Sequence, residues 1–171
     1  MRVGVLTISD RSARGEREDR SGPALASEMA SKGWEVAKAA VVADEAALVS
    51  QRLQEWADSG EVDLILTTGS TGFSPRDVAP EATLAVVNRL APGLAEAMRA
   101  RGLQQTPHSM LSRAVAGIRG EVLIVNLPGS PKAAQEGLQV ILPALSHAVE
   151  LLGGVPGSEA RHRHPPTPLT I

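Results

Sequence analysis

The chain has 171 residues, a length that suits a single domain with a substantial hydrophobic core. Its net charge of −2 and its 2% of aromatic residues argue against nonspecific nucleic-acid binding and against base-stacking platforms for single strands. The absence of cysteine excludes disulfides, thiolate zinc sites and cysteine catalysis. No apolar run approaches the roughly 20 residues of a membrane span and no signal-peptide pattern opens the chain, so we expect a cytoplasmic protein that binds neither nucleic acid nor membrane.

Strand-like and helix-like patterns alternate along the chain. Aliphatic and β-branched runs predict four strands, at residues 2–9, 34–42, 62–67 and 121–127, of which the first and the third are expected to be buried. Helical spacing predicts helices at residues 23–32, 44–60, 81–89, 93–100 and 110–116, and a long last helix from residue 131 that bends at Pro143. We therefore predict an α/β fold, a three-layer sandwich with a mostly parallel central sheet.

The last residues have a different composition. We expect residues 1–153 to form one domain and the Pro-rich segment 154–171 to be a tail without periodic structure. His162 and His164 lie in that segment at i, i+2 spacing, and we predict that they belong to a solvated tail rather than to a metal site. His108 lies in a polar connection with no second ligand at metal spacing, so we predict a surface loop residue there.

The segment 67–80, T-T-G-S-T-G-F-S-P-R-D-V-A-P, directly follows the third predicted strand. Gly69 and Gly72 permit a turn with positive φ, and successive N–H groups in such a turn can form an anion-binding nest. Arg76 offers a planar fork suited to phosphate, and Asp77 offers an oxygen ligand suited to Mg²⁺. Short hydroxyl donors are added by Thr68, Ser70 and Thr71. Because ligands bind outside the carboxyl ends of parallel strands, we predict this loop at the site, with an ordinary tight turn as the alternative.

The other strand ends also carry polar or glycine-containing segments. A polar loop of about a dozen residues follows the first strand, a length typical of functional or disordered loops. Asp44, after the second strand, is a predicted N-cap of the next helix. After the fourth strand, Gly129 allows close backbone approach and Ser130 is the predicted N-cap of the last helix. This arrangement predicts an anion-binding site, with an ordinary strand–turn–helix connection as the alternative.

Taken in order, these motifs resemble the MogA/MoaB family of molybdenum-cofactor biosynthesis proteins. The matching pieces are S-D-R from Ser9, D-x-S-G from Asp19, the D-E pair at Asp44, T-T-G-S-T-G…R-D…P-E-A from Thr67 and L-P-G-S-P-K-A from Leu127. The resemblance covers roughly residues 2–152. The family pattern has T-G-G-T-G where this chain carries Ser70 as the third residue, and Ala79 replaces a common Thr.

This resemblance implies a molybdopterin adenylyltransferase, which transfers AMP from Mg-ATP to the phosphate of molybdopterin. It implies that Asp44 and Asp77 are the catalytic carboxylates and hold Mg²⁺. It also implies a homotrimer and a downstream molybdenum-insertion protein as a partner. Molybdopterin and ATP are then expected to bind at Ser9, Asp10, Thr68, Gly69, Ser70, Thr71, Gly72, Arg76, Pro128, Gly129 and Ser130.

Two other functions stay open. The first is a non-catalytic molybdopterin-binding carrier or scaffold of the same pathway, supported only by Ser70 in place of glycine. The second is an unrelated phosphate-binding α/β enzyme, which explains each loop separately but not their joint order.

Overall fold

The structure of the protein, a computed structural model, describes residues 1–158. Its centre is a six-stranded sheet with the order β2-β1-β3-β6-β5-β4. Four strands run parallel: β1 (Arg2–Ile8), β2 (Glu35–Val42), β3 (Leu64–Thr68) and β6 (Val122–Leu127). At one edge of the sheet, β5 (Ala116–Arg119) pairs antiparallel with β6, and β4 (Arg89–Leu90) pairs antiparallel with β5. The predicted mostly parallel α/β fold is confirmed, while the predicted tail residues His162 and His164 lie outside the described residues.

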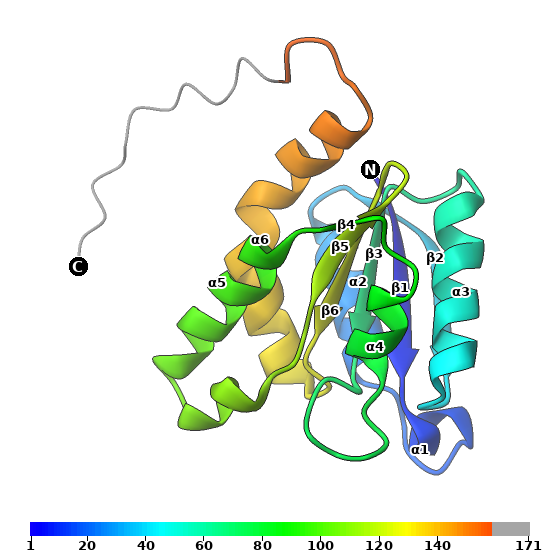
Figure 1. Cartoon of the computed structure of the whole chain (residues 1–171), viewed down its shortest axis with the longest axis vertical. Helices are drawn as coiled ribbons and strands as arrows, with labels where there is room; N and C mark the ends of the chain where they lie inside the picture. The colour runs from blue at the N-terminus through cyan, green and yellow to red at the C-terminus, as the bar shows by residue number, and fades with distance from the viewer. Residues whose placement is uncertain (159–171) are drawn as a thin grey trace.

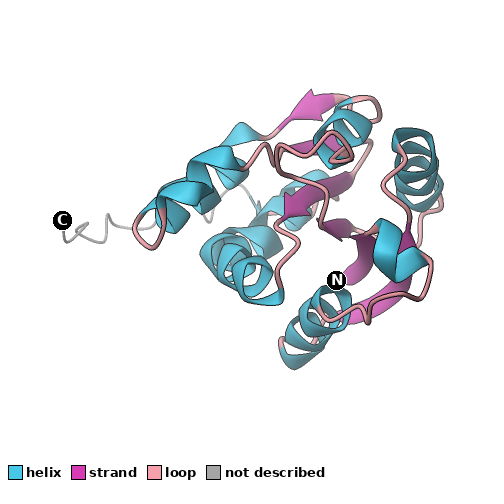
Figure 2. Ribbon diagram, turned by 90° about the horizontal axis from the view of Figure 1, so that it is seen from below, coloured by secondary structure: helices cyan, strands magenta, loops and turns pink. Residues whose placement is uncertain are grey.

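Helices cover both faces of the sheet (Figures 1 and 2). One face carries α2 (Ser21–Ser31), α5 (Pro92–Leu103) and α6 (Pro131–Leu152), and the other carries α3 (Ala46–Asp58) and α4 (Ala79–Leu84). Side chains of a strand alternate between the two faces. Accordingly, Leu64 and Leu66 of β3 pack with the first set of helices, and Ile65 packs with the second. Two short elements, α1 (Asp10–Ala13) and the 3₁₀ helix η1 (Pro107–Leu111), lie in the connections.

The strands β4 and β5 differ from the sequence prediction, which had only four strands and two helices that reached into β4 and β5. The helix predicted over residues 81–89 ends at Leu84, and the chain then enters β4. The helix predicted over residues 110–116 is wrong as well, because η1 ends at Leu111 and Ala116 begins β5. The strand β4 has two residues, which is too short to produce a period-2 pattern. The strand β5 was missed because it contains Gly117, whose close approach to Arg89 exists only in the folded chain.

The last helix begins as expected, because the Ser130 hydroxyl accepts a hydrogen bond from the Ala133 N–H at 3.1 Å. Its buried face includes Leu138, Ile141 and Leu145, and the helix continues through Pro143. The bend at Pro143 stays a prediction. Within residues 1–158, no helix combines the length and apolar character needed to cross a membrane.

A buried amide ties the strands together just below the site. Asn126 in β6 is fully buried, and its Nδ2 donates to the hydroxyls of Thr67 at 2.9 Å and Thr83 at 2.8 Å. Its Oδ1 accepts from the Val115 N–H at 3.2 Å. Because buried polar groups are costly unless paired, this satisfied network fixes β3, β6 and α4 relative to one another.

Candidate functional site

A cavity of about 480 Å³ lies at the carboxyl ends of the parallel strands. The chain leaves β1 toward β2 on one side, while β3 lies on the other, so the strand order reverses at β1 and β3. Such a switch point is where open α/β sheets bind ligands. The cavity collects these predicted site residues from the loops after β1, β2, β3 and β6: Ser9, Asp10, Asp44, Thr68, Gly69, Ser70, Arg76, Asp77, Gly129 and Ser130.

Three predicted site residues line a second cavity instead, of about 330 Å³. They are Thr71, Gly72 and Pro128. The other walls come from α5, η1 and α6, with Met98 and Val140 as apolar examples and His108 on the η1 side. His108 is exposed, as predicted, and its Nδ1 lies 3.2 Å from the Thr106 hydroxyl. Since consecutive residues of the loop after β3 line the two cavities, that loop is the wall between them.

Glycines bring the loops after β3 and β6 into contact. Gly69 has φ 97°, and a Cβ at this position would lie 2.3 Å from the Ile8 carbonyl oxygen. A Cβ at Gly129 would lie 3.1 Å from the Gly69 Cα. Hydrogen bonds join the same loops, from the Gly69 N–H to Leu127 O at 3.2 Å and from the Thr68 hydroxyl to Pro128 O at 2.7 Å. The two glycine-containing turns therefore form one continuous surface.

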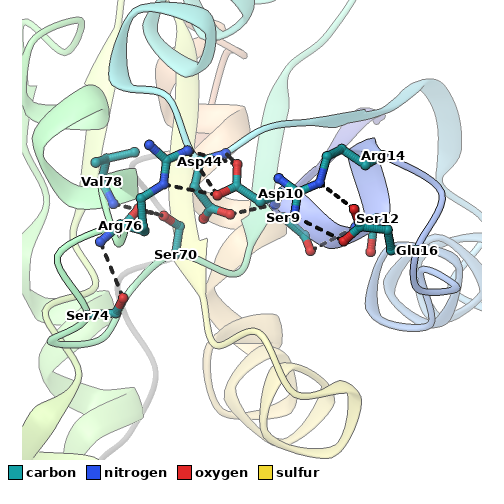
Figure 3. A network of polar contacts seen from close by, with 10 residues as sticks. All are labelled: Ser9, Asp10, Ser12, Arg14, Glu16, Asp44, Ser70, Ser74, Arg76 and Val78. Atoms are coloured by element: carbon teal, nitrogen blue, oxygen red, sulfur yellow. Dashed lines mark hydrogen bonds and ion pairs between the residues drawn. The ribbon is translucent and has the colours of Figure 1, made fainter.

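Ser70 adopts the left-handed conformation that glycine usually occupies, with φ 58°. Its hydroxyl accepts from the Val78 N–H at 2.8 Å and donates to Arg76 O at 3.4 Å (Figure 3). Its carbonyl accepts from the Ala79 N–H at 3.0 Å. The side chain thus closes the loop onto the start of α4 and offsets the cost of a positive φ.

Two substitutions at Ser70 are expected to separate these effects. Ser70→Gly removes the strain but also the hydroxyl bonds, so its free energy of unfolding should stay within about 1 kcal/mol of wild type. Ser70→Ala keeps the strained backbone and loses the bonds, so it should be about 1–2 kcal/mol less stable. Denaturant unfolding measures both, and equal stabilities for the two variants would contradict this account.

Asp44 has a different role from the predicted N-cap. The N-cap of α3 is Glu45, without a side-chain capping bond. The Asp44 carboxylate instead accepts from the Asp10 N–H at 2.6 Å, and the Asp10 carboxylate accepts from the Asp44 N–H at 3.0 Å. This reciprocal pair joins the loops after β1 and β2 and fixes both carboxylates at the cavity (Figure 3).

Arg76 reaches Asp10 across the cavity mouth. Its Nε lies 3.0 Å from Oδ2 and its Nη2 lies 2.9 Å from Oδ1 of Asp10, a two-point ion pair (Figure 3). This hydrogen-bonded guanidinium holds the pKa of Asp10 below its usual value. Because 58% of the Arg76 side chain is exposed, its fork is accessible to an incoming anion.

The stability contributed by this ion pair is expected to depend on pH. Since the folded-state pKa of Asp10 is lowered, the contribution is complete above the ordinary carboxyl pKa of about 3.9 and is lost as the pH falls through the lower folded value. Asp10→Asn keeps an oxygen acceptor for the Asp44 N–H but removes the charge. The melting temperatures of wild type and Asp10→Asn should therefore differ at neutral pH and converge in acid. A difference that is constant with pH would contradict the assignment.

Asp77 closes the other side of the cavity. Its Oδ2 accepts from the Ser74 N–H at 2.9 Å, and its N–H donates to Ser74 O at 2.9 Å. Among residues 1–158, no group of three or more His, Cys, Asp or Glu side chains could hold a metal ion. Asp44 and Asp77 both line the first cavity and offer hard oxygen ligands, which fit a Mg²⁺ ion held by two carboxylates and further ligands rather than by a closed protein cage.

Comparison with known proteins identifies the family. Residues 4–147 match the family described as "Probable molybdopterin binding domain". The chain belongs to this family. It is 42% identical to a molybdopterin adenylyltransferase of Helicobacter pylori (strain J99), over 89% of this chain and 88% of that protein. It is also 42% identical to gephyrin of Dictyostelium discoideum, over 95% of this chain but only 24% of gephyrin.

A solved structure agrees with this assignment. The molybdopterin biosynthesis enzyme MoaB from Thermus thermophilus is 51% identical, with a TM-score of 0.85, and the match covers 91% of this chain and 98% of that structure. The predicted membership of the MogA/MoaB family is therefore confirmed. The family match runs from β1 into α6 and includes all four loops that build the cavity.

The D-x-S-G motif of this family member has a structural explanation. The Asp19 Oδ1 accepts from the N–H groups of Ser21 and Gly22 at 3.1 and 3.0 Å, which satisfies the start of α2. The Asp19 Oδ2 accepts from the Thr7 hydroxyl at 2.7 Å. A Cβ at Gly22 would lie 2.4 Å from that hydroxyl oxygen, so this position requires glycine. The motif anchors α2 against β1 at the cavity edge.

Sequence reasoning missed four arginines, three in one loop and one far along the chain. Arg11, Arg17 and Arg20 line the cavity from the polar loop after β1, in which no arginine was predicted as a site residue. Four arginines within ten residues of a long loop were the available signal. Arg113 contacts the loop after β3 from 36 or more residues away, and no local pattern marks it.

Proposed function

We propose that this protein is a molybdopterin adenylyltransferase that transfers AMP from Mg-ATP to the phosphate of molybdopterin. The observation that carries the proposal is the cavity in which two mutually packed glycine turns meet the carboxylates of Asp44 and Asp77. The names of the family relatives support the same chemistry. An unrelated phosphate-binding enzyme leaves the joint order of the four loops unexplained.

The reaction joins a phosphate oxygen of molybdopterin to the α-phosphorus of ATP and breaks the bond from that phosphorus to the oxygen bridging to the β-phosphate. Pyrophosphate is the leaving group. Transfer of this kind depends mainly on in-line positioning and on neutralising charge at phosphate oxygens. The backbone N–H groups of residues 70–72 and 129–130 and the hydroxyls of Thr71 and Ser130 would hold phosphates, since the Gly69 N–H and the Thr68 and Ser70 hydroxyls already donate to loop carbonyls. Arg76 would exchange Asp10 for a phosphate oxygen, since both are two-point acceptors for a guanidinium.

Asp44 and Asp77 would hold the magnesium ion. When bound, the ion neutralises charge on the phosphates of the nucleotide. Asp10 keeps the Asp44 carboxylate oriented through the reciprocal backbone bonds, and the Ser74 N–H does the same for Asp77. The protein therefore contributes a pre-organised pair of ligands rather than a nucleophile.

The two cavities suit the two halves of the reaction. The first is lined by carboxylates, arginines and loop N–H groups, which suit a triphosphate with its metal ion. The second presents mostly apolar surface, from side chains such as Met98 and Val140, together with polar groups such as Ser112 and Glu136, a combination that suits a flat heterocycle such as a pterin. We assign ATP to the first and the pterin to the second, with the molybdopterin phosphate at the shared loop wall.

Pyrophosphate release tests the proposal. Purified protein with ATP, Mg²⁺ and molybdopterin should release pyrophosphate, and omission of molybdopterin or metal should stop it. A non-catalytic carrier would bind molybdopterin without releasing pyrophosphate, and that result would replace the enzyme with the carrier.

The assembly and cellular setting are proposed from the family resemblance. We infer a homotrimer in the cytoplasm that passes its product to a molybdenum-insertion protein. Light scattering at micromolar concentration should give the mass of three chains, and a monomer would contradict this assembly.

A further inference from the structure

Arg113 binds the loop after β3 through both its backbone and its side chain. It lies between η1 and β5. Its N–H donates to Thr71 O at 2.9 Å, its Nε to Gly72 O at 2.6 Å and its Nη2 to Asp77 O at 2.8 Å. Its Nη1 pairs with the Glu81 carboxylate. Arg113 therefore contacts the loop after β3 near its start, at Thr71 and Gly72, and near its end, at Asp77. It also contacts Glu81 in α4, just beyond the loop.

Residues 71–77, which Arg113 contacts, belong to the loop that forms the wall between the two cavities. Thr71 and Gly72 line the second cavity, whereas Asp77 lines the first. Ser112 and Ala114, on either side of Arg113, also line the second cavity. Loss of the Arg113 contacts is therefore expected to change the shape of both cavities.

The partner carboxylate remains charged at neutral pH. Burial is the largest single influence and would raise the pKa of Glu81, but the hydrogen bond from Arg113, a backbone hydrogen bond and the positive charge of Arg113 together outweigh it, so the pKa of Glu81 lies below its ordinary value. The guanidinium is thereby anchored at one end by an ion pair while its other N–H groups hold the loop carbonyls. A lysine has no fork and cannot make these contacts together.

We propose that Arg113 is a positioning residue for adenylyl transfer, which acts by fixing the backbone that places Asp77 at the metal and phosphates. This inference rests on the proposed function. Arg113 itself does not line the first cavity, so its effect is transmitted through Asp77 and the shared wall.

Arg119 provides a matched control. Its guanidinium also pairs with a carboxylate, at 2.9 and 2.7 Å from Asp58, and also donates to a backbone carbonyl, at 2.9 Å from Val86 O. It pairs in the sheet with Val122, at the start of β6, whereas the site lies at the end of that strand. Arg119→Met therefore removes a similar set of contacts far from the chemistry.

The experiment compares Arg113→Met with Arg119→Met by melting temperature, by kcat and KM, and by calorimetric Mn²⁺ binding in the presence of ATP. Arg113→Met should lower kcat by about 100-fold and weaken Mn²⁺ binding by about tenfold, because supporting residues act through the groups that they orient. Arg119→Met should change both by less than about twofold at a comparable loss of melting temperature. Equal effects of the two variants, or normal kcat and Mn²⁺ binding in Arg113→Met, would overturn the proposal.

Chemical rescue provides a second measurement if Arg113→Met folds poorly. Arg113→Ala in millimolar guanidinium chloride should regain activity and Mn²⁺ affinity, while Arg119→Ala should not respond. Absence of rescue in a folded Arg113→Ala would count against positioning by the guanidinium. If wild type itself releases no pyrophosphate, the proposed function fails, and the Mn²⁺ measurement still decides whether Arg113 orders the site.

Discussion

Asp77→Asn is expected to abolish adenylyl transfer while leaving molybdopterin binding nearly intact. The asparagine has the same size, and its oxygen can still accept from the Ser74 N–H that holds Asp77 at 2.9 Å. What disappears is the negative charge that would hold Mg²⁺ on the phosphates. Loss of a group that stabilises developing charge lowers kcat by on the order of 10³-fold. Pyrophosphate release and a separate molybdopterin titration measure the two properties.

Asp58→Asn is the matched control for Asp77→Asn. Asp58 is an aspartate whose main partner is Arg119, outside both cavities, and its side chain is 58% exposed. This variant should keep its turnover within about twofold, because exposed ion pairs contribute little. Retained turnover in Asp77→Asn would remove Asp77 from the mechanism.

Gly69→Ala is expected to cause the largest loss of stability among single methyl additions near the site. The added Cβ would lie 2.3 Å from the Ile8 carbonyl oxygen, and φ 97° is unfavourable for alanine. Backbone cannot move aside as a flexible side chain can, so the loop or the end of β1 must shift. We expect the free energy of unfolding to fall by about 3–4 kcal/mol and turnover to be lost with it.

Gly33→Ala is the control for Gly69→Ala, because it introduces backbone strain without a steric clash. Gly33 has φ 76° but nothing within 4 Å of the added Cβ. Its substitution should therefore cost only the conformational strain, about 1–2 kcal/mol, and leave turnover unchanged. Denaturant unfolding of the two variants gives the difference. Equal losses would mean that the contact between Gly69 and β1 does not constrain the site.

Local patterns gave much of the site. Each buried strand is a run of aliphatic residues, and each following turn carries glycine, serine or aspartate, so both are readable from neighbouring letters. Parallel strands end on the same edge of a sheet, which is why ten of the predicted site residues line one cavity. The three others line the neighbouring cavity on the far side of the same loop, because periodicity does not say on which side of a loop a residue lies, and their binding roles stay predictions.

The sequence by itself determined the strand–helix alternation, the glycine turns at strand ends and the family to which the chain belongs. Only the tertiary structure decided that Asp44 pairs with Asp10 rather than capping α3, that Arg76 reaches Asp10, and that two short strands extend the sheet. The physical reason is distance along the chain. Turns and amphipathic faces follow from residues within a few positions, whereas the partners of Arg76 and Arg113 are 66 and 32–42 positions away and meet only once the sheet has formed.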